Sequence, residues 1–135
     1  MIVKIKGVDR VAAVTDSLYP AGTDLKEGIT DGVAFIVEDG VCRLPDRSAF
    51  AGSIATDDRL IRVMTQQAGV PLHEAVRMMS LTPAQIIGIG DKTGSIEVGK
   101  DADIVIYDGN PLEIKSSVVK TIINGNVVWE NENKG

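Results

Sequence analysis

The chain is poor in the two residue types that most often form covalent cross-links or hold catalytic metals. It has 135 residues, with one cysteine, Cys42, and one histidine, His73. A single cysteine excludes a disulfide within the chain. A catalytic zinc ion usually takes three protein ligands, most of them histidines. The chain alone therefore cannot supply a histidine-rich metal site.

Long apolar runs and basic clusters are also missing. No stretch of the sequence approaches the roughly 20 apolar residues that cross a bilayer, and the first residues lack the pattern of a secretory signal. The net charge is −5, with acidic and basic residues interspersed. Nucleic acids and anionic membrane surfaces attract basic patches instead. We therefore expect a cytoplasmic protein that binds neither nucleic acid nor membrane.

Apolar periodicity and turn residues predict strands, then helices, then strands again. A polar, glycine-punctuated loop is expected over 19–32, and Asp39-Gly40 is typical of a hairpin turn. The early strands are expected over 2–6, 11–14, 33–37 and 41–44. The helices are expected over 56–69, 71–80 and 83–88, with Thr82 capping the last one. The later strands are expected over 94–99, 102–107, 118–123 and 126–129, the last two joined by a turn at Asn124-Gly125.

Asp16 is the first candidate for a functional residue. It follows Val11–Val14, an apolar run that predicts a short buried strand, and Pro20 and Gly22 then open a loop. Barrel enzymes place catalytic groups at the C-terminal ends of their parallel strands. The alternative is that the side-chain oxygen of Asp16 caps a turn or a helix. The choice between the two depends on the rest of the chain.

The end of the chain carries a recognisable signature. Ser80–Gly88, followed by Lys92–Val105, resembles the C-terminal signature of the amidohydrolase superfamily. The resemblance implies an α/β fold: the last strand and helices of a (β/α)8 barrel, plus C-terminal strands of a small β-sandwich. Residues 1–93 would belong to the barrel with its active-site loop and hairpin, and residues 94–130 to the sandwich. The polar residues 131–135 are expected to form a frayed tail.

A narrower resemblance lies upstream of this signature. Val14–Ser17 with Pro20–Gly22, and Phe50–Ser53 after the hairpin, look like the N-acetylglucosamine-6-phosphate deacetylases, one family of that superfamily. The resemblance extends from about Gly7 to Glu130, which corresponds to only the C-terminal third of such an enzyme. We therefore expect this chain to be the last part of a longer deacetylase.

This resemblance implies roles for four residues. Asp16 matches the aspartate that ends the eighth barrel strand and serves as general acid/base. Phe50, Ala51 and Gly52 match the segment that lines the sugar-phosphate pocket, with a phenylalanine where the family often has leucine. In the family, a divalent metal such as zinc is held by a glutamate and two histidines from earlier strands. Those ligands are absent from this chain, so it is expected to be inactive alone.

The chemistry of amide hydrolysis agrees with these roles. A carboxylate within hydrogen-bond reach can accept a proton from water and later deliver it to the departing nitrogen. Small residues at 51–53 let the backbone approach a sugar closely. The expected partners are a small sugar-phosphate substrate and further copies of the chain. Two alternatives stay open: a non-catalytic assembly or regulatory module, and an amidohydrolase acting on another substrate.

The remaining reactive or aromatic side chains are expected to be structural. His73 falls in the first turn of a helix, on a solvated face, and Cys42 is a small buried residue of the hairpin. Asp57-Asp58 stabilises the dipole at a helix start. Trp129 is expected to pack against the β-layer.

Overall fold

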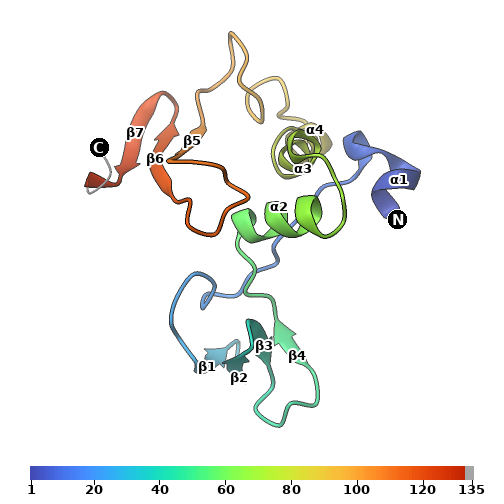
Figure 1. Cartoon of the computed structure of the whole chain (residues 1–135), viewed down its shortest axis with the longest axis vertical. Helices are drawn as coiled ribbons and strands as arrows, with labels where there is room; N and C mark the ends of the chain where they lie inside the picture. The colour runs from blue at the N-terminus through green and yellow to red at the C-terminus, as the bar shows by residue number, and fades with distance from the viewer. Residues whose placement is uncertain (133–135) are drawn as a thin grey trace. The chain divides into compact units, whose positions relative to one another are not determined.

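The computed structural model describes residues 1–132 and divides into two compact units (Figure 1). Met1–Ala13 and the chain from Ile61 onward form unit 1, and Val14–Leu60 forms unit 2. Each unit contains one antiparallel sheet, and helices complete a mixed α/β chain. Of the tail expected over 131–135, residues 133–135 lie outside the described residues.

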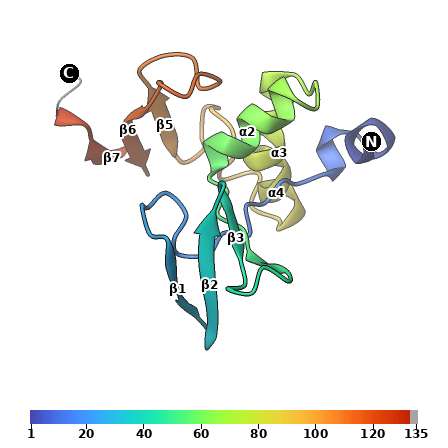
Figure 2. The same cartoon turned by 60° about the horizontal axis from the view of Figure 1, so that its bottom comes forward.

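Unit 2 is built on a four-stranded antiparallel sheet. Its strands follow the chain in the order β1 (Glu27–Thr30), β2 (Val33–Glu38), β3 (Val41–Arg43) and β4 (Phe50–Gly52). The predicted hairpin of β2 and β3 is confirmed, whereas β1 lies in the segment predicted to be a loop. Figure 2 shows the β1–β2 hairpin clearly.

Two Asp-Gly turns make these hairpins. Both residues of Asp31-Gly32 have positive φ, at 50° and 80°, and those of Asp39-Gly40 have 51° and 71°. Two-residue hairpin loops favour this backbone, and Asp-Gly adopts it readily. The first turn therefore carried the same sequence signal as the second one, and β1 could have been predicted from it.

The core of unit 2 is small and aromatic. Phe35 and Cys42 are buried, with exposed fractions of 1% and 0%. The Tyr19 ring meets the Phe35 ring edge to face, with centroids 5.6 Å apart. A β-carbon on Gly28 would lie 2.2 Å from the Tyr19 hydroxyl oxygen and 2.7 Å from the Phe35 ring. Glycine at this point of β1 therefore makes room for the aromatic pair.

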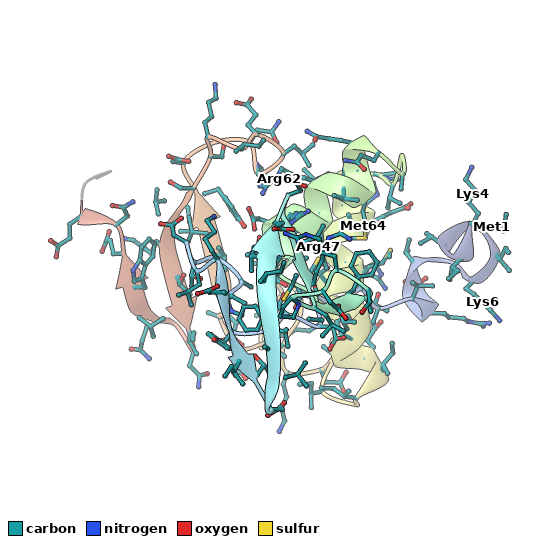
Figure 3. All side chains as sticks on the ribbon, turned by 90° about the horizontal axis from the view of Figure 1, so that it is seen from below. Met1, Lys4, Lys6, Arg47, Arg62 and Met64 are labelled. Carbon is teal, nitrogen blue, oxygen red and sulfur yellow. The ribbon has the colours of Figure 1, made fainter. Side chains whose placement is uncertain are left out.

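The predicted strand over residues 2–6 is wrong, because the segment forms the short helix α1 (Ile2–Lys6). No residue of α1 is buried, and Figure 3 shows Lys4 and Lys6 extending away from the helix. Gly7 donates its N–H to the Val3 carbonyl at 2.8 Å. An alternating pattern makes a strand only where a sheet edge accepts its hydrogen bonds, whereas a helix satisfies its own.

The strand expected over Val11–Val14 is not formed either. The backbone is extended at Val11, with φ −127° and ψ 109°, after the 3-10 helix η1 (Val8–Arg10). The Ala13 N–H donates to the Met78 carbonyl at 2.9 Å. Val14 is 74% exposed, and no strand within residues 1–132 pairs with this segment. A parallel strand of this kind requires neighbouring strands.

The three predicted helices are present in the structure. They are α2 (Asp57–Gln66), α3 (Leu72–Met79) and α4 (Leu81–Ile86). On α3 the buried side chains are Ala75 and Met78, whereas Val76 is 41% exposed. Among residues 1–132, no helix has both the length and the apolar character needed to cross a membrane.

Thr82 does not cap α4 as predicted. It lies inside the helix and is fully buried, and its hydroxyl donates to the Val8 carbonyl at 2.8 Å. A buried hydroxyl without a partner is costly, so this bond holds η1 against the helices. Thr82 therefore joins segments of unit 1 that are far apart in the sequence.

The second sheet has the order β5 (Ile104–Tyr107), β6 (Val118–Ile123) and β7 (Asn126–Glu130). The predicted Asn124-Gly125 turn is confirmed, with φ values of 54° and 76°. No strand forms over 94–99; there Lys100 Nζ donates to Ser95 Oγ at 2.6 Å. Trp129 lies on β7 opposite Thr121 and is 48% exposed, so the expectation that it packs against the β-layer stays a prediction.

Two glycines with the same backbone allow a matched test of packing in unit 1. Gly94 and Gly99 have φ values of 93° and 94°. A β-carbon on Gly94 would lie 2.9 Å from the Leu81 Cα, whereas nothing lies within 4 Å of one on Gly99. We expect Gly94→Ala to lower the free energy of unfolding by about 1–3 kcal/mol more than Gly99→Ala does. Urea denaturation of both variants measures the difference, and equal losses would contradict the close packing.

The Cys42 thiol offers a test of the unit 2 core. Burial raises the pKa of this thiol, so it stays protonated near neutral pH. We expect an aromatic disulfide reagent to react with the folded chain more slowly than with the urea-unfolded chain, by a factor on the order of 100 or more. Equal rates would show that the β2–β3 hairpin does not enclose the side chain.

Candidate functional site

Asp16 lies at the start of unit 2, directly before the bridge residue Ser17. Its φ is 49°, in the left-handed region that aspartate tolerates better than most residues. The residue is exposed, and within residues 1–132 its carboxylate makes no hydrogen bond or ion pair. The capping role considered as the alternative is therefore not what the side chain does in this structure. The carboxylate is available to an external group.

The residues after Asp16 are paired with the end of β4. Ser17 and Ser53 form a parallel β-bridge, and the Leu18 N–H donates to the Ser53 carbonyl at 2.9 Å. The Ser17 hydroxyl also donates to the Ala55 carbonyl. Asp16 and the predicted pocket segment Phe50–Gly52 are thus brought to adjacent strand-like segments, although they lie more than thirty residues apart in the sequence.

The predicted pocket segment is β4 itself. Phe50 is 71% exposed, whereas Ala51 and Gly52 are half-buried. Arg43, the partner of Phe50 across β3 and β4, holds its guanidinium carbon 5.3 Å from the centre of the Phe50 ring. This cation–π contact orients an apolar ring that faces solvent. The arrangement provides an apolar wall with a cationic edge.

The two arginines of this hairpin have different surroundings. Arg47 donates from Nε and Nη2 to the two carboxylate oxygens of Glu38, at 2.9 and 2.6 Å. This hydrogen bonding lowers the pKa of the Glu38 carboxyl and keeps it charged. Arg47 is therefore paired with Glu38, whereas Arg43 lies beside the Phe50 ring. Sequence reasoning missed Arg43, because only the strand register places it against Phe50.

A cavity of about 280 Å³ lies in unit 2 beside this segment. Its lining includes Gly52 and Ser53 of the predicted pocket, and the Arg59 side chain, which donates to the Gly40 carbonyl at 3.1 Å. Ser53 Oγ accepts the Ala55 N–H at 3.1 Å, which turns the chain from β4 towards α2. The small residues thus leave backbone groups accessible at the end of β4.

The described residues do not fit a catalytic metal. No group of three or more His, Cys, Asp or Glu side chains within residues 1–132 could hold an ion. His73 is exposed in the first turn of α3, and Cys42 is buried in the hairpin. Asp58 of the Asp57-Asp58 pair accepts a hydrogen bond from the Thr56 hydroxyl at the start of α2. Cys42 and Asp58 therefore contribute to the hairpin and to the start of α2, and not to a metal site.

Comparison with known proteins gives one family. A sequence model described as "Amidohydrolase family" matches residues 17–129. The chain is 35% identical over 124 residues to the N-acetylglucosamine-6-phosphate deacetylase of Haemophilus influenzae, a match that covers 90% of this chain and 31% of that enzyme.

Solved structures give the same result. The chain matches the N-acetylglucosamine-6-phosphate deacetylase of Pasteurella multocida with a TM-score of 0.84 and 33% identity, over 96% of this chain and 32% of that one. It also matches an aspartate-to-alanine variant of the Mycobacterium smegmatis deacetylase, solved in complex with N-acetyl-D-glucosamine-6-phosphate. That TM-score is 0.79 at 26% identity, over 94% and 32% of the two chains. The chain thus spans about a third of the length of these relatives. The family match covers most of its residues, so the chain belongs to the amidohydrolase family.

Proposed function

We propose that this chain is the C-terminal portion of an enzyme that hydrolyses N-acetylglucosamine 6-phosphate to glucosamine 6-phosphate and acetate. The observation that carries the proposal is the match of 96% of the chain to a solved deacetylase of that specificity, at a TM-score of 0.84. The complex of the Mycobacterium smegmatis relative with the N-acetylated sugar phosphate supports the same substrate class.

The proposed architecture follows from the matched region. Residues 1–93 supply the last strand, helices and active-site hairpin of a (β/α)8 barrel, and residues 94–130 supply strands of a small β-sandwich, followed by the tail 131–135. The extended backbone at Val11 supports this assignment: among residues 1–132 no strand pairs with Val11–Val14, so this segment could pair with barrel strands of a longer polypeptide.

Asp16 is proposed to be the general acid/base of the reaction. Amide hydrolysis moves one proton from the attacking water and delivers one to the departing amine. A carboxylate that is exposed and has no partner within residues 1–132 can take part in both transfers without first breaking a bond. The divalent metal expected of this family would have its ligands outside this chain, and we derive no step through it.

Phe50, Ala51 and Gly52 are proposed to bind the substrate. The exposed Phe50 ring offers an apolar face to the sugar, and the small residues after it leave the backbone accessible.

A phosphorylated sugar is charged and stays in the compartment where it is made, which favours a cytoplasmic enzyme. Exposed apolar side chains such as Ile86 and Ile87, at 61% and 70%, are consistent with a homo-oligomer.

The proposed role of Asp16 is tested in a chimera in which this chain replaces the matched third of the Pasteurella multocida deacetylase. We expect the chimera to release acetate from N-acetylglucosamine 6-phosphate, and Asp16→Asn to lower kcat by roughly 100- to 10,000-fold. The 135-residue chain alone, supplied with zinc, is expected to be inactive.

Asp31→Asn is the matched control, because Asp31 is also an exposed aspartate of unit 2 with a φ of 50°. We expect this variant of the chimera to keep its activity. A folded chimera without deacetylase activity would contradict the proposed function. An active Asp16→Asn chimera would contradict the role of Asp16 alone.

The proposed role of Phe50 predicts a change in substrate binding. In the same chimera, Phe50→Ser removes the apolar wall and is expected to raise KM by about tenfold, since burying a large apolar side chain is worth roughly 1.5–3 kcal/mol. Phe50→Leu keeps an apolar wall and should change KM by less than about threefold. Steady-state kinetics measures both variants, and an unchanged KM for Phe50→Ser would show that the ring does not face the sugar.

A further inference from the structure

Gly52 lies between two segments of unit 2. On one side it pairs with Cys42 of β3. On the other side, the residue after it, Ser53, forms the parallel bridge with Ser17. Gly52 therefore lies where the sheet of unit 2 is next to the segment that carries Asp16.

The Leu18 side chain occupies the space that a side chain at position 52 would take. A β-carbon on Gly52 would lie 2.6 Å from Leu18 Cδ1 and 2.8 Å from Leu18 Cγ. These distances are shorter than any van der Waals contact, and the Cγ atom cannot move away without a change of the Leu18 rotamer. Leu18 is thus held at two points, by its side chain against Gly52 and by its N–H on the Ser53 carbonyl.

The backbone at Asp16 has few other restraints within unit 2. The Asp16 carboxylate has no partner within residues 1–132, so no side-chain bond fixes the residue. Its positive φ of 49° is also disfavoured for a residue with a β-carbon. Upstream, in unit 1, Ala13 donates to the Met78 carbonyl, and within unit 2 the attachment next to Asp16 is that of Ser17 and Leu18 to Ser53.

We propose that Gly52 is a positioning residue for Asp16: the absence of a side chain at position 52 lets Leu18 dock, and the docked Leu18 fixes the backbone segment that presents the Asp16 carboxylate. This role differs from the direct substrate contact proposed for Gly52 above, because it acts through Leu18. The steric part of the inference stands on the geometry alone, whereas its catalytic consequence rests on the proposed function.

A double-mutant cycle on the 135-residue chain tests the steric part. Gly52→Ala is expected to shift the ¹H–¹⁵N amide signals of Thr15–Leu18, because the new methyl group displaces Leu18. Combining it with Leu18→Ala makes room for that methyl group, so the double variant should return these signals towards the positions seen in Leu18→Ala alone. Gly32→Ala adds a methyl group where nothing lies within 4 Å, and it should leave Thr15–Leu18 unshifted.

Kinetics of the chimera tests the catalytic part. A misplaced general acid/base lowers kcat, and a displacement near 1 Å can cost about 100-fold. We therefore expect Gly52→Ala to lower kcat by about 10- to 100-fold, whatever its effect on KM through the substrate contact proposed above, and the double variant to recover part of the loss in kcat. A rise in KM at constant kcat would overturn the positioning role in favour of direct substrate contact.

The outcomes separate this inference from the proposed function. Unshifted Thr15–Leu18 signals in Gly52→Ala would overturn the inference, and so would a double variant that is no better than Gly52→Ala. An unchanged kcat despite shifted signals would overturn its catalytic part. An inactive chimera before any substitution would count against the proposed function, and the spectra of the 135-residue chain would still decide the role of Gly52.

Discussion

The backbone pairing of Ser17 and Leu18 with Ser53 is the interaction on which the candidate site depends. It is a small contact, consisting of a parallel bridge, a hydrogen bond of 2.9 Å from Leu18 and a hydroxyl bond from Ser17 to Ala55. It nevertheless joins the segment that carries Asp16 to the end of β4. Without it, no backbone pairing would relate the aspartate to the Phe50–Gly52 strand.

The sheet of unit 2 can support this contact because its first strands pair with neighbours that lie close in the sequence. Two Asp-Gly turns with positive φ close the hairpins of β1, β2 and β3 over short distances in the sequence. The buried Phe35 and Cys42 then give the sheet one packed face. The apolar and cationic groups of Phe50 and Arg43 lie at its fourth strand, on a framework that requires no distant part of the chain.

The sequence predicted the elements whose signals are local. The Asp39-Gly40 and Asn124-Gly125 turns and the three helices were predicted from turn residues and apolar periodicity. Residues 2–6 and 11–14 were mispredicted because a strand forms only beside a partner strand, and no partner for them lies within residues 1–132. The sequence predicts Thr82 as a cap because its distant acceptor, the Val8 carbonyl, has no sequence signal.

The candidate site was predictable only in part for the same reason. Asp16 and Phe50–Gly52 were identified from a resemblance to the deacetylases, whereas nothing in the sequence indicated that Leu18 packs on Gly52 or that Arg43 lies over Phe50. Such contacts depend on register between segments far apart in the chain. They emerge from the fold and not from any motif.

Amide hydrogen exchange at Leu18 tests the central pairing most directly. The structure predicts that this N–H, bonded to Ser53, exchanges at least about tenfold more slowly than in an unstructured peptide, as does the Val37 N–H bonded to Lys26 within the sheet. Exchange of Leu18 at the unstructured rate, with Val37 still protected, would show that the segment carrying Asp16 is not attached to the end of β4.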